Sequence, residues 1–184
     1  MGYQKRRKKL RKVVKFFHRN QVKKYNGEPY IHHLDTVARL SDKYCGTVTG
    51  YEIGLCHDLL EDTKCGPRLL YIILIVLGYT RNRSRIIVDG VIVLTDVYTR
   101  EAYPTLNRLK RKRLEAIKVA EGNAEVQTVK YCDITDNTSN ILMNDKKFAK
   151  VYLPEKEYML TLLTKGNKYA YKIALQSAQS SETW

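Results

Sequence analysis

The segment that decides the fold and the chemistry covers residues 57–63 and reads His-Asp-Leu-Leu-Glu-Asp-Thr. On a helix, His57 and Asp58 are neighbours that can point into one cleft, where a single ion can take an imidazole nitrogen and a carboxylate oxygen. Glu61 and Asp62 each follow one of them by one helical turn, on nearly the same face. Carboxylates placed beside a metal can orient or deprotonate a water molecule. The segment therefore predicts a metal site that acts on water.

Two residues elsewhere in the chain can complete such a site. His33 leads an otherwise apolar helix, and Asp133 lies between apolar neighbours, where a carboxylate is costly to bury unless something binds it. Two His and two Asp suit Mn²⁺ or another first-row divalent ion better than a thiolate-favouring metal. Other interpretations stay open, because a His-Asp pair is common, His33 can be a surface or cap residue, and Asp133 can face solvent.

Apolar residues elsewhere recur with the period of helices, and turn signals are sparse. The expected helices cover residues 7–19, 32–42, 51–62, 67–77, 85–94, 105–120, 124–143 and 146–178. We expect the apolar run at 69–77 to be buried on all sides, and Ser84 to cap the helix that follows it, although 85–94 also allows a strand. Gly166 can divide the last range in two. The pattern predicts an all-α fold in a single compact domain.

The charge of the chain is concentrated at its start. The 184 residues include 33 Lys and Arg against 19 Asp and Glu, a net charge of +14. Eleven of the bases precede the first acid, Glu28, and from there on the excess is only +3. A block of like charge attracts polyanions such as nucleic acid, membrane phosphate or a highly phosphorylated substrate. The block itself does not tell which of these is bound.

The sequence also indicates where the protein is expected to act. The longest apolar stretch, at 69–77, is far shorter than the roughly 20 residues that cross a bilayer, and no secretory signal is apparent. The four cysteines show no CxxC spacing, so we expect reduced, buried thiols. These features favour a cytoplasmic protein without a membrane partner, and they leave its oligomeric state open.

The motifs together resemble a known family. Residues from about 18 to 163 are similar to HD-domain phosphohydrolases, in particular to the hydrolase domain of RelA/SpoT-type alarmone enzymes and the small alarmone hydrolases related to them. The segments that carry the resemblance are 18–24, 27–33, 57–63, 88–91 and 129–133, together with Asn137. The resemblance implies one HD-domain helical bundle over residues 1–184. It would have a basic leading helix at 1–17, a core at about 18–163, and a C-terminal helix and tail at about 164–184.

Carried over residue by residue, the resemblance implies an Mn²⁺ ion with four ligands and a pair of acids that positions and activates the attacking water. The acids are Glu61 and Asp62, and the ligands are His33, His57, Asp58 and Asp133. The family's usual Pro after the first metal His is Leu34 here, and its Ala-Asp-Arg is residues 132–134, Cys-Asp-Ile. Neither departure removes a ligand.

Several residues are expected to contact a substrate. By resemblance, Asn137 contacts the nucleotide, and Lys23 and Lys24 stand where the family has an Arg-Lys pair that meets guanine and phosphates. Lys23 lacks the planar guanidinium that stacks on a base, which puts the guanine preference in doubt. From its charge alone, the helix after Pro104 can supply further cations. We expect these to be Arg108, Arg111 and Lys112, although they can also form a solvated basic face.

The family reaction removes the 3′-pyrophosphate of ppGpp or pppGpp. The resemblance therefore implies a hydrolase-only enzyme of the stringent response with a (p)ppGpp-like substrate. One alternative is an HD phosphohydrolase that acts on a dNTP, a nucleoside monophosphate or NADPH. Another is a protein that binds nucleic acid or a partner through its basic N-terminus and has an auxiliary metal site.

Overall fold

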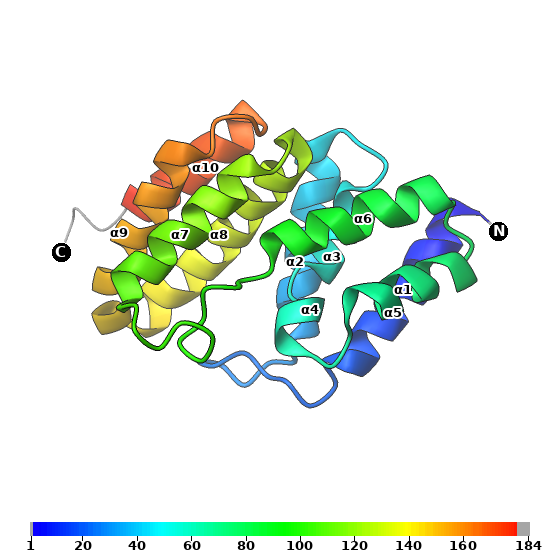
Figure 1. The fold of residues 1–184 in the computed structure, drawn as a ribbon, viewed down its shortest axis with the longest axis horizontal. Coiled ribbons are helices and arrows are strands. Elements are labelled where there is room, and N and C mark those ends of the chain that lie inside the picture. Colours follow the sequence, from blue (N-terminus) through cyan, green and yellow to red (C-terminus); the bar gives the residue numbers. More distant parts are fainter. Residues whose placement is uncertain (1, 180–184) are drawn as a thin grey trace. The chain divides into compact units, whose positions relative to one another are not determined.

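A computed structural model describes residues 2–179 and divides the chain into two compact units, Met1–Thr95 and Asp96–Trp184, each described by itself (Figure 1). The helices of the first unit are α1 (Tyr3–Phe17), α2 (Ile31–Cys45), α3 (Gly50–Cys56), α4 (Leu59–Asp62), α5 (Pro67–Val76) and α6 (Arg81–Leu94). Those of the second are α7 (Arg108–Glu121), α8 (Ala124–Asn144), α9 (Lys146–Leu162) and α10 (Lys168–Gln179). Apart from a single bridge between Val22 and Pro29, no β-structure occurs in residues 2–179.

The all-α class predicted from the sequence is confirmed, and the strand alternative for 85–94 is wrong because α6 covers it. As expected, Gly166 lies between two helices, α9 and α10. Pro154 lies inside α9. The end of the predicted tail, residues 180–184, lies outside the described residues. The organisation of residues 1–184 as one domain stays a prediction.

Two helix starts differ from the expected ones because side-chain caps set them. The Thr80 hydroxyl accepts a hydrogen bond from the Arg83 backbone N–H, so α6 begins at Arg81 and the expected cap Ser84 is buried inside the helix. The Asn107 side chain accepts one from the Lys110 backbone N–H in the same way, so α7 begins at Arg108 rather than next to Pro104.

A close contact between α2 and α3 forms the centre of the first unit. A Cβ atom added at Gly54 would lie 2.7 Å from the Ser41 Oγ and 3.0 Å from the Ala38 Cα, so α3 can approach α2 this closely only with glycine at this position. The fully buried apolar side chains of this unit include Leu34, Val37, Ile53, Leu55, Ile87 and Val91. This contact fixes α3 against α2, the two helices that lead to the predicted metal ligands.

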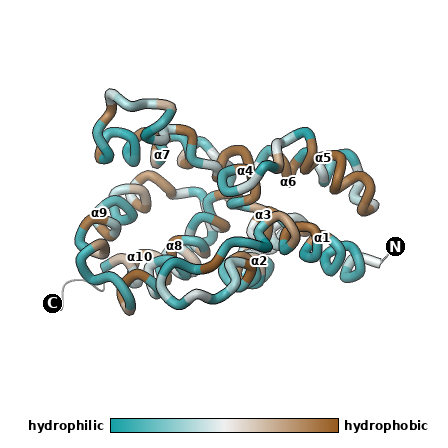
Figure 2. The backbone as a smooth tube through the Cα atoms, turned by 90° about the horizontal axis from the view of Figure 1, so that it is seen from below, coloured by the Kyte–Doolittle hydropathy of each residue, from teal (hydrophilic) through white to brown (hydrophobic). Residues whose placement is uncertain are grey.

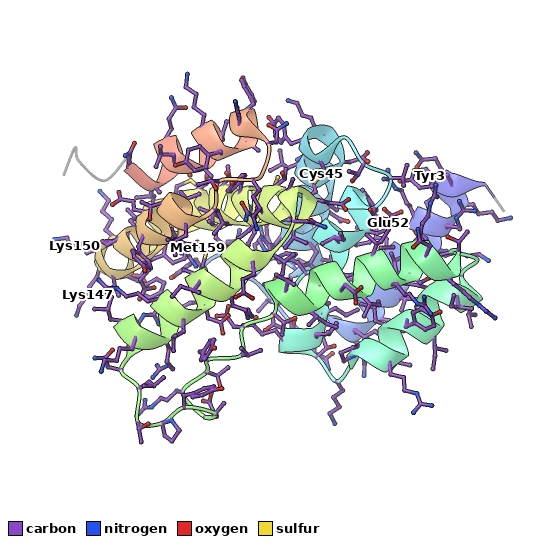
Figure 3. The ribbon with its side chains drawn as sticks, turned by 45° about the horizontal axis from the view of Figure 1, so that its top comes forward. Tyr3, Cys45, Glu52, Lys147, Lys150 and Met159 are labelled. Atoms are coloured by element: carbon purple, nitrogen blue, oxygen red, sulfur yellow. The ribbon has the colours of Figure 1, made fainter. Side chains whose placement is uncertain are left out.

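The basic leading helix is anchored by one of its own bases. Arg7 is buried, its guanidinium lies 4.2 Å from the ring centroids of both Tyr3 and Tyr51, and it pairs with Asp42 at 2.7 Å and with Glu52 at 3.2 Å. Figure 3 labels Tyr3 and Glu52. Part of the N-terminal charge is therefore matched inside the first unit and is not available to a polyanion.

The second unit packs α9 and α10 against α8. Tyr131 of α8 is buried and donates a hydrogen bond of 2.7 Å to the Leu163 carbonyl at the end of α9. The Asn123 side chain caps α8 by accepting from the Val126 N–H. This arrangement makes α8, which contains Asp133 and Asn137, the most buried helix of its unit.

Candidate metal centre

His57 and Asp58 lie in a turn between two short helices. The sequence predicted one helix over 51–62, but α3 ends at Cys56 and α4 begins at Leu59. The Nδ1 of His57 lies 2.8 Å from the Gly54 carbonyl oxygen, which can only accept, so Nδ1 carries the proton. Its Nε2 therefore presents a lone pair, the form in which imidazole binds metals.

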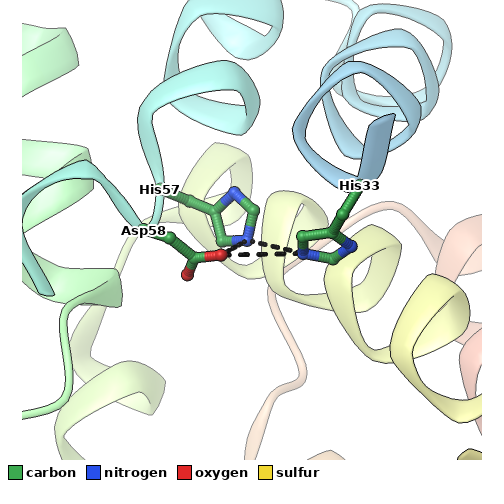
Figure 4. A group of neighbouring side chains, drawn as sticks. All are labelled: His33, His57 and Asp58. Atoms are coloured by element: carbon green, nitrogen blue, oxygen red, sulfur yellow. Dashed lines mark hydrogen bonds and ion pairs between the residues drawn. The ribbon is translucent and has the colours of Figure 1, made fainter. Parts of the chain in front are cut away.

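Three predicted ligands meet in the first unit. One ligand atom each of His33, His57 and Asp58 lies within 4.8 Å of the others (Figure 4). The Asp58 Oδ2 is 3.0 Å from the His57 Nε2 and 3.6 Å from the His33 Nε2, and the two Nε2 atoms are 3.3 Å apart. Both imidazoles are 2% exposed. The structure thus brings together side chains from α2 and from the turn after α3.

These residues fit a divalent ion. Nitrogen and oxygen ligands about 2.0–2.2 Å from one first-row ion stand roughly 3 Å apart, close to the distances found here. The donor set is two imidazoles and a carboxylate, which first-row divalent ions accept. Because Asp58 is partly exposed while the imidazoles are buried, water has access to one side of the group. The identity of the ion, expected to be Mn²⁺, stays a prediction.

Three residues around this group were not assigned a role from the sequence. The Tyr30 hydroxyl donates a hydrogen bond of 2.6 Å to the Asp58 Oδ2, and the Tyr30 ring stacks on His18, with centroids 5.5 Å apart. The Nδ1 of His18 lies 2.5 Å from Gln21 Oε1, and Gln21 Nε2 donates to the Asp62 carbonyl at 2.7 Å. Burial lowers the pKa of His18, which favours its neutral form. All three belong to the segments 18–24 and 27–33 that carry the resemblance, but these motifs alone did not indicate their contacts.

The two predicted catalytic acids occur on α4. The Asp62 backbone N–H donates to the Asp58 carbonyl at 2.9 Å, which keeps one helical turn between these residues as predicted. Burial raises the pKa of the Asp62 carboxyl to about 6, and the charge of Asp58 adds to the rise. His57, His33 and a hydrogen bond from Tyr30 oppose it. Asp62 as a whole residue is exposed, so this burial is partial. Glu61 is also exposed, and its catalytic role stays a prediction.

One solved structure with this fold is that of a protein described as a metazoan ortholog of SpoT that hydrolyzes ppGpp and plays a role in starvation responses. The match has a TM-score of 0.74 and 19% sequence identity, and it covers 94% of this chain and 93% of the other. The protein has the fold of this SpoT-type hydrolase. The resemblance found in the sequence is thereby confirmed for the fold. No protein-family model and no curated protein matches the chain.

The fourth predicted ligand, Asp133, lies in the second unit. It is 5% exposed, and its carboxylate accepts hydrogen bonds from Lys130 Nζ at 2.8 Å and from Asn137 Nδ2 at 2.6 Å. These donors offset the cost of burying the charge. The roles of Asp133 as a ligand and of Asn137 as a nucleotide contact stay predictions.

The predicted substrate cations already have partners inside their own units. Lys23 Nζ lies 3.7 Å from the Glu28 carboxylate, and the Lys24 Nζ lies 3.3 Å from the Tyr25 hydroxyl. Both lysines belong to the segment that joins α1 to α2. The role of both lysines as substrate contacts stays a prediction.

The three cations predicted on α7 differ in their surroundings. Arg108 makes two hydrogen bonds to Glu155, at 2.7 and 2.9 Å, and Lys112 pairs with Asp96. Both line a hollow of about 390 Å³ between α7 and α9, together with Arg113 and Lys150, the latter labelled in Figure 3. Arg111 is not among the lining residues and donates to the Leu106 carbonyl. Arg108 and Lys112 thus border the same hollow, whereas Arg111 is directed to the backbone, and the role of all three as substrate contacts stays a prediction.

Proposed function

We propose that this protein is a divalent-metal-dependent phosphohydrolase that removes the 3′-pyrophosphate of (p)ppGpp by attack of water. The observation that carries the proposal is the convergence of His33, His57 and Asp58. The SpoT-type fold supports a nucleotide substrate, because the similar solved structure is that of a protein described as hydrolysing ppGpp. Mn²⁺ is the ion that we expect, with Asp133 as the fourth ligand.

The metal-binding residues and the two acids would have different roles in hydrolysis. A divalent ion held by His33, His57 and Asp58 would supply Lewis acidity toward water and phosphate oxygens. Asp62 would accept a proton from the attacking water, since a carboxyl with a pKa of about 6 is largely ionised at neutral pH and is a stronger base than an ordinary Asp. Glu61, on the same short helix, would orient that water.

Substrate binding would depend on cationic and polar side chains. Lys23 and Lys24 would contact the base and phosphates, Asn137 would contact the nucleotide, and the α7 cations Arg108, Arg111 and Lys112 would balance charge on the phosphoryl oxygens. Because an ammonium does not stack on a base as a guanidinium does, Lys23 should give a weaker preference for guanine than an arginine would.

A product screen tests the proposal. Purified protein is incubated with Mn²⁺ and, separately, with ppGpp, pppGpp, dNTPs, a nucleoside monophosphate and NADPH, and the products are separated by ion-exchange chromatography. We expect GDP or GTP and intact pyrophosphate from the first two substrates, and no turnover by Asp58→Ala. Turnover of another nucleotide alone would keep the metal site and reject the substrate.

A further inference from the structure

Helix α5 exposes a stripe of large apolar side chains. The sequence predicted that this segment is buried on all sides, but only Leu70 and Leu74 of α5 are buried. The exposed fractions are 41% for Leu69, 48% for Ile72, 37% for Ile75 and 78% for Val76. These four residues, at i, i+3, i+6 and i+7, form one face of the helix, which we call the α5 stripe. Figure 2 shows brown, hydrophobic colour along α5. A contiguous exposed patch of this kind marks an interaction surface.

The segment that contains the α5 stripe is rich in bases. From residue 64 to residue 88 it contains five bases and no acid, and Arg68, Arg81 and Arg85 are exposed. The guanidinium of Arg6 lies 5.7 Å from the ring centroid of Tyr79, just after α5, which brings the start of α1 to this end of α5. Lysines 5, 8, 9, 12 and 15 of α1 are also exposed. The proposed hydrolysis does not account for these charges.

We propose that the α5 stripe and the bases around it dock the protein onto the surface of a bilayer that contains anionic lipids. A matching partner has to offer apolar contact and negative charge together. Apolar side chains on such a helix enter the boundary between headgroups and acyl chains, while neighbouring Lys and Arg bind the anionic headgroups. In the part of the chain that the structure describes, no helix is long and apolar enough to cross a bilayer, so the contact would be peripheral.

Two other occupants fit these observations less well. A second copy of this chain, which carries a net charge of +14, would bring cationic rims together around the stripe. Four side chains also fall short of the roughly 800 Å² per partner of a standard interface. A nucleic acid offers phosphates, but the phosphate backbone that dominates its binding to basic proteins gives no apolar contact for Ile72 and Val76.

Vesicle sedimentation tests the proposal without any measurement of hydrolysis. The full chain is mixed with phosphatidylcholine vesicles that contain or lack phosphatidylglycerol. We expect sedimentation with the anionic vesicles, and a loss of about tenfold or more in partitioning for the double variant Ile72→Glu/Val76→Glu. Met143→Glu, which changes an apolar residue of the second unit that is about as exposed as Val76, should bind like the wild type. Circular dichroism is used to check that each variant is folded.

A second variant tests the charge. Arg81→Ser/Arg85→Ser should lower partitioning to anionic vesicles by about fivefold for each base removed. The proposal is overturned if the wild type does not sediment with anionic vesicles, or if Ile72→Glu/Val76→Glu partitions like the wild type. Concentration-dependent dimerisation that the same substitutions abolish, without vesicle binding, would instead assign the stripe to self-association. Binding of an oligonucleotide without vesicle binding would assign the bases to nucleic acid.

Discussion

The hydroxyl of Tyr30 donates a hydrogen bond of 2.6 Å to the Oδ2 atom of Asp58, the same oxygen that lies 3.0 Å from the His57 Nε2. Tyr30 thus holds a predicted metal ligand in position. Groups that orient metal ligands in this way commonly raise the metal affinity roughly 10–100-fold.

Replacement of Tyr30 by Phe should therefore weaken metal binding. We expect the dissociation constant of Mn²⁺, measured by calorimetry on metal-depleted protein, to rise roughly 10–100-fold in Tyr30→Phe. Tyr25→Phe removes a hydroxyl from the same segment between α1 and α2, where its partner is Lys24, and serves as the control. Equal Mn²⁺ affinity in both variants and the wild type would show that Tyr30 does not position Asp58.

Substitutions of the predicted metal ligands should abolish both metal binding and turnover, whereas substitution of a catalytic acid should affect turnover alone. Asp58→Ala and Asp133→Ala should lose Mn²⁺ binding and hydrolysis together, because each removes a predicted ligand. Glu61→Gln should bind Mn²⁺ like the wild type and lose most of its turnover, since a neutral amide lacks the negative charge with which the Glu61 carboxylate would hold and orient the attacking water. The measurements are calorimetry and steady-state hydrolysis of ppGpp. A fully active Glu61→Gln protein would refute the role of Glu61.

The raised pKa of Asp62 predicts an unusual dependence of stability on pH. With a pKa of about 6 in the folded protein and an ordinary lower pKa in the unfolded chain, this carboxyl lowers stability as pH rises through that interval. In the metal-free protein, Asp62→Asn should unfold at a higher temperature than the wild type near about pH 8, with a smaller difference near about pH 4. Thermal denaturation with a chelator present measures this. A difference that does not change with pH would contradict the assignment.

The buried ion pair of α1 should be important for stability. Arg7→Ala leaves Glu52, which is fully buried, with the Tyr79 hydroxyl at 3.1 Å as its remaining side-chain partner. Breaking a buried pair from one side commonly costs about 3–5 kcal/mol. Lys8→Ala, an exposed neighbour, should change the free energy of unfolding by about 0.5 kcal/mol or less. Urea denaturation measures the free energy of unfolding of both variants. Equal midpoints would show that α1 is not anchored through Arg7.

The ligand group was predictable because its residues stand in short motifs. The segments at 27–33 and 57–63 named His33, His57 and Asp58, and the structure brings these three together. The role of Tyr30 could not be read in the same way, because its hydrogen bond joins residues 28 positions apart and depends on how the segment before α2 folds back. The same holds for Gly54, whose function in the site is to let α3 approach α2.

Other details of the fold cannot be predicted from the periodicity of apolar residues. A run in which nearly every residue is apolar has no polar face, so the sequence could not indicate which side of α5 meets the core; the structure buries only Leu70 and Leu74. The start of α6 depended on a choice between two capping residues four positions apart, Thr80 and Ser84, and Thr80 makes the cap. Similarly, the sequence does not distinguish Arg7 from the other ten bases before Glu28. Its burial is explained by its ion pairs with Asp42 and Glu52, which are distant in the sequence.

The most direct measurement is hydrolysis of ppGpp by metal-depleted protein before and after Mn²⁺ is added, with the wild type and Asp58→Ala compared side by side. The account predicts no GDP before addition, release of GDP and intact pyrophosphate by the wild type once Mn²⁺ is present, and none by Asp58→Ala at any Mn²⁺ concentration. Failure of the wild type to hydrolyse ppGpp at saturating Mn²⁺, or equal hydrolysis by the two proteins, would contradict it.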